Sequence, residues 1–165
     1  MKRLLTILCL VLLSSCSPPD GPFETFYENG QLSERGTYRD GEFDGLQEVF
    51  HENGQLSGRG NHLDGKLHGL FEFFYENGQL ETRTNYVDGE QDGLREGFHE
   101  NGQLETRGNF IDDERNGLWE DFDEDGQLEN RRNYIDDKLE GLSELFDEDG
   151  NVIGTRTYRN GVQVE

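Results

Sequence analysis

Beyond an N-terminal apolar segment, hydrophobic and polar residues alternate along the chain with a period of two. Leu46, Glu48 and Phe50 occupy alternate positions in one such segment, so a strand would place all three on one face. A second alternating segment follows after a short polar interruption. The pattern predicts two short strands, over residues 46–51 and 55–63, and nowhere after the first apolar segment does it predict a helix.

The interruption between the two segments is an Asn-Gly or Asp-Gly pair that recurs every 24 residues without insertion or deletion. Such pairs supply the positive φ angles that tight hairpin turns need. The pairs are Asn29-Gly30, Asn53-Gly54, Asn77-Gly78, Asn101-Gly102, Asp125-Gly126 and Asp149-Gly150. Six units therefore fill residues 21–164, and they predict an all-β fold in which tandem hairpins build one elongated, single-layer antiparallel sheet.

Several positions of the unit keep one kind of residue throughout. One position is always Glu and a second is always Phe, a third is Arg in five units, and a fourth is aromatic or His. The Glu and Phe positions are Glu24, Glu48, Glu72, Glu96, Glu120 and Glu144, and Phe26, Phe50, Phe74, Phe98, Phe122 and Phe146. The other two are Arg35, Arg59, Arg83, Arg107 and Arg131, with Thr155 in the last unit, and Tyr38, His62, Tyr86, Phe110, Tyr134 and Tyr158. We expect the six Phe and the aromatic column to form the buried stripe.

Two hairpin registers are compatible with this pattern. A two-residue turn would place Glu48 opposite Arg59 and build a ladder of Glu–Arg pairs, each contributing about 0.2–1 kcal/mol. A three-residue loop with a glycine bulge would place Phe50 opposite Leu56 instead. Because a slip of one residue exchanges the faces, we expect only one register to hold. The bulged loop is favoured, since the sheet needs an apolar stripe more than a charge ladder.

The landmarks of the unit resemble the variant MORN repeat of bacteria. The matching residues are Gly69-Leu70 at the start of a unit, Phe74-Tyr75-Glu76-Asn77-Gly78-Gln79-Leu80 in its middle and Tyr86-Val87-Asp88-Gly89 near its end. The resemblance implies stacked hairpins in one long, twisted antiparallel sheet. Some bacterial members are described as antitoxin components of toxin–antitoxin systems, whereas eukaryotic MORN proteins act mainly as scaffolds, sometimes near membranes.

Three residues depart from this pattern. Asp113 and Asp137 replace the glycine of the turn that closes the fourth and fifth units, and we expect them to alter those turns. Pro22 replaces the Leu that opens the other units, which suits a capping unit.

Residues 1–15 have the layout of a secretory signal peptide. Lys2 and Arg3 precede an apolar run over residues 4–13, which is about half of the ~20 residues that a membrane-spanning helix needs. We therefore expect a cleaved signal rather than a transmembrane anchor.

The end of this signal, Leu13-Ser14-Ser15-Cys16, resembles the lipobox of bacterial lipoproteins. The resemblance implies that Cys16 is lipidated and becomes the new N-terminus, and Ser17 at the following position resembles an outer-membrane signal of Gram-negative bacteria. The expected location is the cell envelope, lipid-anchored at the outer membrane. Residues 16–22 contain all three prolines and would form a stiff tether to the first hairpin.

Charge restricts the partners of the mature protein. The whole chain carries −21, and removal of Lys2 and Arg3 leaves 13 basic against 36 acidic residues, a net charge of −23. Such a surface repels phosphate backbones, so nucleic-acid binding is disfavoured and a basic protein partner is favoured. Cys9 would be removed with the signal, so no disulfide is expected.

One segment resembles the start of a calcium loop. Asp121, Asp123 and Asp125 have D-x-D-x-D-G spacing, but the twelfth position is Arg132 rather than a bidentate Glu. An acidic hairpin turn is the favoured interpretation, and neither a metal nor another cofactor is expected. A calcium-dependent envelope protein remains an alternative.

No pattern of residues predicts an active site, so we expect a protein that is not an enzyme. Trp119 follows Leu118 and should lie on the opposite face, either exposed as a partner contact or covered. The leading hypothesis is a membrane-anchored binding or scaffold lipoprotein that recognises another macromolecule through its repeat sheet. The alternative is an antitoxin-like or immunity-like inhibitor of a basic toxin.

Overall fold

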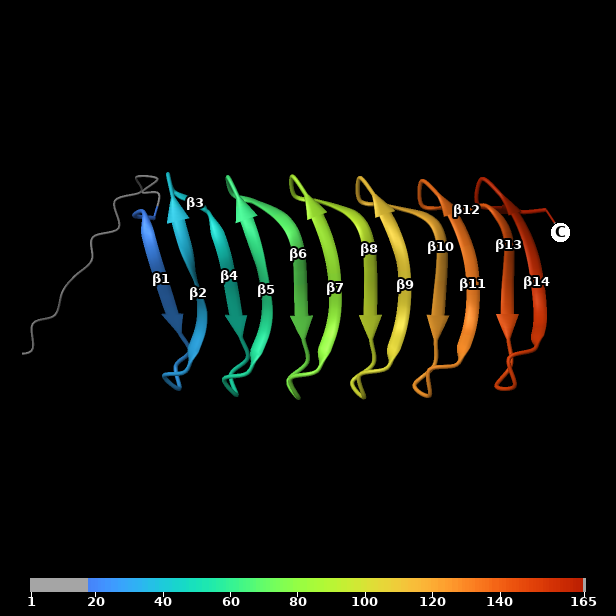
Figure 1. The fold of residues 1–165 in the computed structure, drawn as a ribbon, viewed down its shortest axis with the longest axis horizontal. Coiled ribbons are helices and arrows are strands. Elements are labelled where there is room, and N and C mark those ends of the chain that lie inside the picture. Colours follow the sequence, from blue (N-terminus) through green and yellow to red (C-terminus); the bar gives the residue numbers. More distant parts are fainter. Residues whose placement is uncertain (1–17, 165) are drawn as a thin grey trace, which may run out of the picture.

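The computed structural model describes residues 18–164, which form a single antiparallel sheet of 15 strands. The strands follow one another across the sheet in chain order, so the first and last units lie at opposite ends (Figure 1). They are β1 (Gly21–Phe26), β2 (Leu32–Arg39), β3 (Glu42–Phe43), β4 (Gly45–Phe50), β5 (Leu56–Leu63), β6 (Lys66–Phe74), β7 (Leu80–Val87), β8 (Glu90–Phe98), β9 (Leu104–Ile111), β10 (Glu114–Phe122), β11 (Leu128–Ile135), β12 (Lys138–Leu139), β13 (Gly141–Phe146), β14 (Val152–Arg159) and β15 (Val162–Gln163). The predicted all-β array of tandem hairpins is confirmed.

Each 24-residue unit contributes one hairpin, and the predicted strands are accurate to about one residue. The expected strands 46–51 and 55–63 correspond to β4 and β5. The hairpin turns all lie along one edge of the sheet and the turns that join successive units lie along the other (Figure 1). We call these the hairpin-turn edge and the unit-turn edge. β1 begins at Gly21, so Pro22 belongs to the first strand as well as to the end of the predicted tether.

The hairpin turn is a three-residue loop closed by glycine. The Gly54 amide donates to the His51 carbonyl at 2.8 Å, and Gly54 has a φ of 84° that a side chain would disfavour. Asn53 does not have a positive φ, contrary to the expectation for an Asn-Gly turn. Its Oδ1 instead accepts a hydrogen bond from the Gln55 amide at 2.8 Å, which fixes the loop from inside.

The two registers that seemed mutually exclusive occur together. Phe50 lies opposite Leu56, as the three-residue loop requires, and Glu48 lies opposite Arg59, as the charge ladder requires. Ser57 is the extra residue of a β-bulge between these two pairs. The expectation that only one register holds was wrong, because a bulge inside the strand absorbs the one-residue shift without exchanging the faces of the rest.

The unit turns keep one conformation whether or not they contain glycine. Both central residues have positive φ in every unit turn, with 50° and 64° at Asp112 and Asp113 and 48° and 62° at Asp136 and Asp137. The expectation that Asp113 and Asp137 alter the turns was therefore wrong. Asp tolerates the left-handed region, and the Asp113 carboxylate also accepts the Gln91 amide of the preceding unit at 2.7 Å.

The two faces of the sheet carry different side chains. The ladder face carries the recurring Glu, Arg and Phe positions, whereas the aromatic face carries the column that runs from Tyr38 to Tyr158. The expectation of a single buried stripe was thus wrong. The aromatic residue lies three positions after the Arg of the same strand, and an odd spacing places two side chains of a strand on opposite faces. Among residues 18–164 the buried apolar side chains are Phe71, Trp119 and Tyr134.

Nothing covers either face as a second layer within the described residues. Residues 18–164 also include no helix with the length and apolar character to cross a membrane. The predicted signal peptide and the lipidation at Cys16 lie outside the described residues.

Candidate interaction surface

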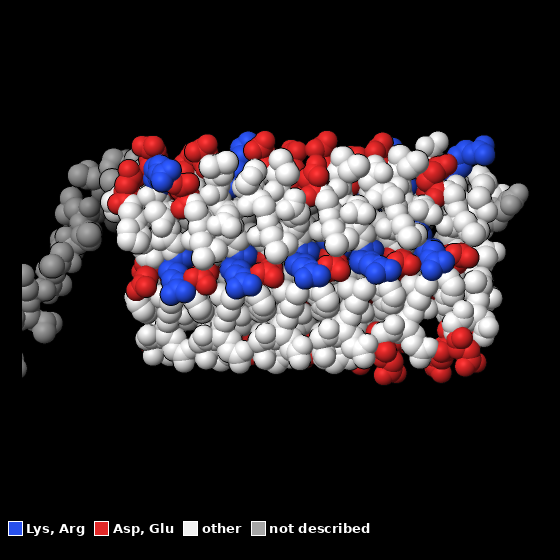
Figure 2. Space-filling model, viewed as in Figure 1, with Lys and Arg blue, Asp and Glu red and all other residues white. Residues whose placement is uncertain are grey.

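A row of ion pairs crosses the ladder face at right angles to the strands. Each Arg pairs with the Glu of the following unit, as shown by the alternating blue and red row in Figure 2. The pairs are Arg35–Glu48 at 2.6 Å, Arg59–Glu72 at 2.7 Å, Arg83–Glu96 at 2.5 Å, Arg107–Glu120 at 2.7 Å and Arg131–Glu144 at 3.5 Å. The row therefore fastens neighbouring units to each other.

This row corrects the predicted pairing within hairpins. Glu48 lies opposite Arg59 of its own hairpin and also opposite Arg35 of the preceding one, and its carboxylate bonds to Arg35. Only Arg131 also reaches the Glu of its own hairpin, Glu120, at 3.3 Å. Each guanidinium additionally lies 5.4–5.7 Å from the ring centroid of the Phe in the next unit. The row is electrically balanced and structural.

An exposed aliphatic surface lies between this row and the unit-turn edge. It is made of two columns on the ladder face, one from the position after the unit's opening glycine and one from the last position before the unit turn. The members are Leu46, Leu70, Leu94, Leu118 and Leu142 in the first column and Leu63, Val87, Ile111 and Ile135 in the second. Each is 42–53% exposed. We call these nine side chains the aliphatic band.

The aliphatic band is bordered by acidic residues on one side. Figure 2 shows carboxylates along the unit-turn edge, above the uncharged band and the Glu–Arg row. Asp residues occupy the unit turns at Asp40, Asp64, Asp88, Asp112, Asp113, Asp136 and Asp137. An Asn of the neighbouring strand lies opposite each of Leu46, Leu70, Leu94 and Leu118, so uncharged polar side chains separate the two aliphatic columns. Large exposed apolar side chains gathered on one face make this surface a candidate interaction site.

Trp119 is covered rather than exposed. Its side chain lies on the aromatic face at 9% exposure, edge-on to Phe110 with ring centroids 5.3 Å apart and to Tyr134 at 6.3 Å. The indole Nε1 donates to the Asn109 carbonyl at 3.3 Å. Of the two alternatives for Trp119, the covered side chain is the one that the structure shows.

Glycines on the neighbouring strand make room for the buried aromatic rings. A Cβ on Gly108 would lie 2.2 Å from the Trp119 ring, and one on Gly60 would lie 2.0 Å from Cδ2 of Phe71. Sequence reasoning missed this relation, although a signal existed. The residue before the recurring Glu is aromatic in every second unit, at Phe23, Phe71 and Trp119. In the other units it is polar, at Gln47, Arg95 and Ser143.

The hairpin-turn edge is tied together by side chains that donate to the backbone of the next unit. Tyr27 and Tyr75 hydroxyls and His51 and His99 Nε2 atoms bond to the carbonyl of the next unit's Phe at 2.5–2.9 Å. The turn asparagines donate to the next unit's turn carbonyls as well, from Asn29, Asn53, Asn77 and Asn101. These two histidines thus have structural partners.

The three carboxylates of the possible calcium loop are not brought together. Asp121 pairs with Arg132 and accepts a hydrogen bond from the Thr106 hydroxyl at 3.1 Å. Asp123 Oδ1 accepts the amides of Asp125 and Gln127 inside the turn at 3.0 and 2.8 Å. Within the described part of the chain, no three His, Cys, Asp or Glu side chains are grouped so that they could hold a metal ion.

The burial of His62 leads us to expect that the stability of the protein depends on pH. Burial beside Phe43 lowers the pKa of His62, and the raising effect of Glu34 is smaller. The folded protein then binds this proton less readily than the unfolded chain, so the contribution to stability is full above about pH 6.5 and declines as the pH falls below it. His62→Tyr, which copies Tyr86 of the next unit, is expected to raise the melting temperature more at pH 5 than at pH 8. The exposed His68→Gln change should leave this pH difference unaltered, and an equal gain at both pH values would contradict the assignment.

The fold and surface define the protein as a tandem β-hairpin repeat protein with one packed aromatic face and one exposed aliphatic band. Six segments match the family described as MORN repeat variant, over residues 19–40, 43–64, 67–88, 91–112, 115–136 and 139–160. Since these segments cover most of the chain, the protein belongs to that family. No curated protein matches the sequence.

Proposed function

We propose that this protein is a non-enzymatic binding or scaffold lipoprotein that recognises a basic protein through the aliphatic band of its ladder face. The observation that carries the proposal is the band itself. Nine aliphatic side chains, each 42–53% exposed, run along the sheet beside an acidic edge. Burial of such a surface contributes about 25 cal/mol per Å² of apolar area, and the acidic border adds selectivity for a basic partner.

A site-specific cross-linking experiment in cells tests this proposal. A photoreactive amino acid replaces Ile111 in the aliphatic band, and a matched one replaces Leu145, which is 45% exposed but lies on the aromatic face. We expect a discrete cross-linked product from position 111 that position 145 does not give. Identical products from both positions, or none from position 111, would exclude the band as the recognition surface.

Membrane attachment through Cys16 is a separate part of the proposal. Cys16→Ala is expected to move the protein from the membrane fraction to the soluble fraction, because the lipid would be the only strong attachment to the bilayer. The measurement is fractionation followed by immunoblotting, with Cys9→Ala as the control that leaves attachment intact. Undiminished membrane retention of the Cys16 variant would refute the anchor.

Inhibition of a basic toxin is the second candidate function. The mature chain's charge of −23 and the carboxylates along the unit-turn edge favour it. A gene next to this one that is toxic alone and harmless when both are expressed would support inhibition. Co-expression that leaves the toxicity unchanged would argue against it.

A further inference from the structure

Each joint between successive units has a donor side and an acceptor side. In the first four joints the donor side, from the second half of one unit, supplies an Arg, a Tyr or His at the hairpin turn and a turn Asn. In the fifth joint Asp123 and Asp125 replace the last two, and Arg131 is the donor that remains. The acceptor side, from the first strand of the next unit, supplies a Glu, a Phe ring and backbone carbonyls. Between the third and fourth units, Arg83 pairs with Glu96, Tyr75 donates to the Phe98 carbonyl at 2.7 Å and Asn77 donates to the Glu100 carbonyl at 3.0 Å.

The C-terminal end of the sheet has lost the donor side. Thr155 occupies the position of the Arg, Asp147 that of the Tyr or His, and Asp149 that of the Asn. An ionised carboxylate only accepts hydrogen bonds, so neither Asp donates to a following carbonyl. A second copy of this chain therefore finds no matching donor at β14, and head-to-tail stacking of copies is disfavoured.

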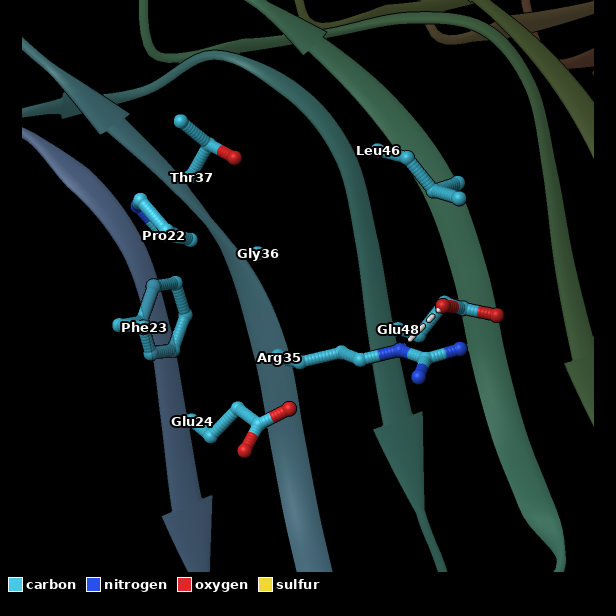
Figure 3. A pocket seen from close by; sticks show the side chains of 8 residues that line it. All are labelled: Pro22, Phe23, Glu24, Arg35, Gly36, Thr37, Leu46 and Glu48. Carbon is cyan, nitrogen blue, oxygen red and sulfur yellow. Dashed lines mark hydrogen bonds and ion pairs between the residues drawn. The ribbon is translucent and has the colours of Figure 1, made fainter.

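The N-terminal end has kept the acceptor side. Phe26 is 59% exposed, whereas the other five Phe of its column are partly covered by an Arg. Glu24 is also exposed, although the equivalent Glu of the other units is not, and it has no ion pair among residues 18–164. Figure 3 shows the reason: the neighbouring Arg35 directs its guanidinium away, to Glu48.

The outer edge of β1 is open within residues 18–164. β1 pairs with β2 alone, whereas the equivalent strands β4, β6, β8, β10 and β13 have a neighbour on each side. Pro22 lacks an amide, but it occupies the position of Leu46 and Leu94, which do not pair with the preceding strand in their own joints. The part of β1 that a new strand would use, from Glu24 onward, therefore remains available.

We propose that the edge of β1 binds an extended, Arg-bearing segment of a different protein, which adds to the sheet as an antiparallel strand. The Arg of that segment pairs with Glu24 and lies over the Phe26 ring. A Tyr or His side chain donates to the Phe26 carbonyl and an Asn side chain donates to the Glu28 carbonyl, as in the joints between units. Strand addition to an open edge is an established mode of peptide recognition, with backbone bonds for affinity and side chains for selectivity. This edge is distinct from the aliphatic band, so each of the two proposals can be tested independently of the other.

Two peptides taken from the chain itself test this proposal. Residues 75–87 contain the complete donor set, with Tyr75, Asn77 and Arg83, and residues 147–159 are the equivalent segment of the last unit without it. Both have 13 residues and a net charge of −1, so they differ in donors rather than in length or charge. Fluorescence anisotropy measures the binding of each labelled peptide to the full-length protein in detergent.

We expect the 75–87 peptide to bind at least about tenfold more tightly than the 147–159 peptide, and Thr155→Arg in the latter to recover part of the difference. Glu24→Gln in the protein should weaken binding of the 75–87 peptide about tenfold, while Glu148→Gln, the same charge change at the opposite end, leaves it unchanged. An unaltered melting temperature of the Glu24 variant verifies its fold. Equal binding of the two peptides, absence of binding by both, or insensitivity to Glu24→Gln would overturn the proposal.

Discussion

Trp119→Ala is expected to lower the free energy of unfolding by about 3 kcal/mol, at the low end of the range for truncating a large aromatic side chain. The indole is 9% exposed and joins Phe110 to Tyr134 across three strands of the aromatic face. Its loss also removes the partner of the Asn109 carbonyl. The reduction stays near 3 kcal/mol because the sheet has one layer, and water can enter the space that the ring leaves.

Chemical denaturation of the two neighbouring variants tests this expectation. Leu118→Ala changes the adjacent residue, which is 43% exposed on the ladder face, and should cost less than about 1 kcal/mol. Urea unfolding followed by circular dichroism gives both values. Equal losses for Trp119→Ala and Leu118→Ala would show that the aromatic face does not stabilise the sheet more than the exposed band does.

Gly60→Ala is expected to lower the free energy of unfolding by about 2 kcal/mol, although alanine normally suits a strand better than glycine. The new Cβ would lie 2.0 Å from Cδ2 and 2.6 Å from Cε2 of Phe71, so the ring has to leave its place over the glycine. Phe71 is one of the three buried apolar side chains, and it also contacts Phe73 and Tyr86.

Gly154 provides the matched control, because it occupies a strand of the last unit without a ring above it. A Cβ there would lie 3.7 Å from Cβ of Leu145, an ordinary contact, so Gly154→Ala should leave stability unchanged or raise it slightly. In a Phe71→Ala background, Gly60→Ala should cost much less than in the natural protein. The same cost in both backgrounds would mean that Phe71 is not the source of the clash.

The two faces thus divide their tasks. Rings seated on glycines hold the aromatic face together, and the Glu–Arg row links successive units on the ladder face. The aliphatic band takes part in neither arrangement, and its side chains remain exposed. The open edge of β1 differs again, because its Glu24 and Phe26 belong to a joint whose other half is missing.

The strands and the recurring residues of the candidate site could be predicted from the sequence. The alternation and the turn residues located the strands, and the 24-residue spacing identified the positions of Glu48, Arg59 and Phe50 as structural. The partners of these side chains could not be predicted. Glu48 lies opposite an Arg on each side, and only the three-dimensional arrangement shows that Arg35 takes its carboxylate.

The sequence by itself determined the all-β class, the six hairpins, the strand limits and the acidic character, because local alternation, turn chemistry and charge express these properties directly. The tertiary structure alone decided four things: the bulge at Ser57 that reconciles two registers, the assignment of Phe and Tyr columns to opposite faces, the seating of Phe71 on Gly60, and the exposure of the aliphatic band. The physical reason is common to all four. Period-two alternation separates the two faces of a strand without stating which is covered, and contacts between strands depend on register, which one bulged residue is enough to change.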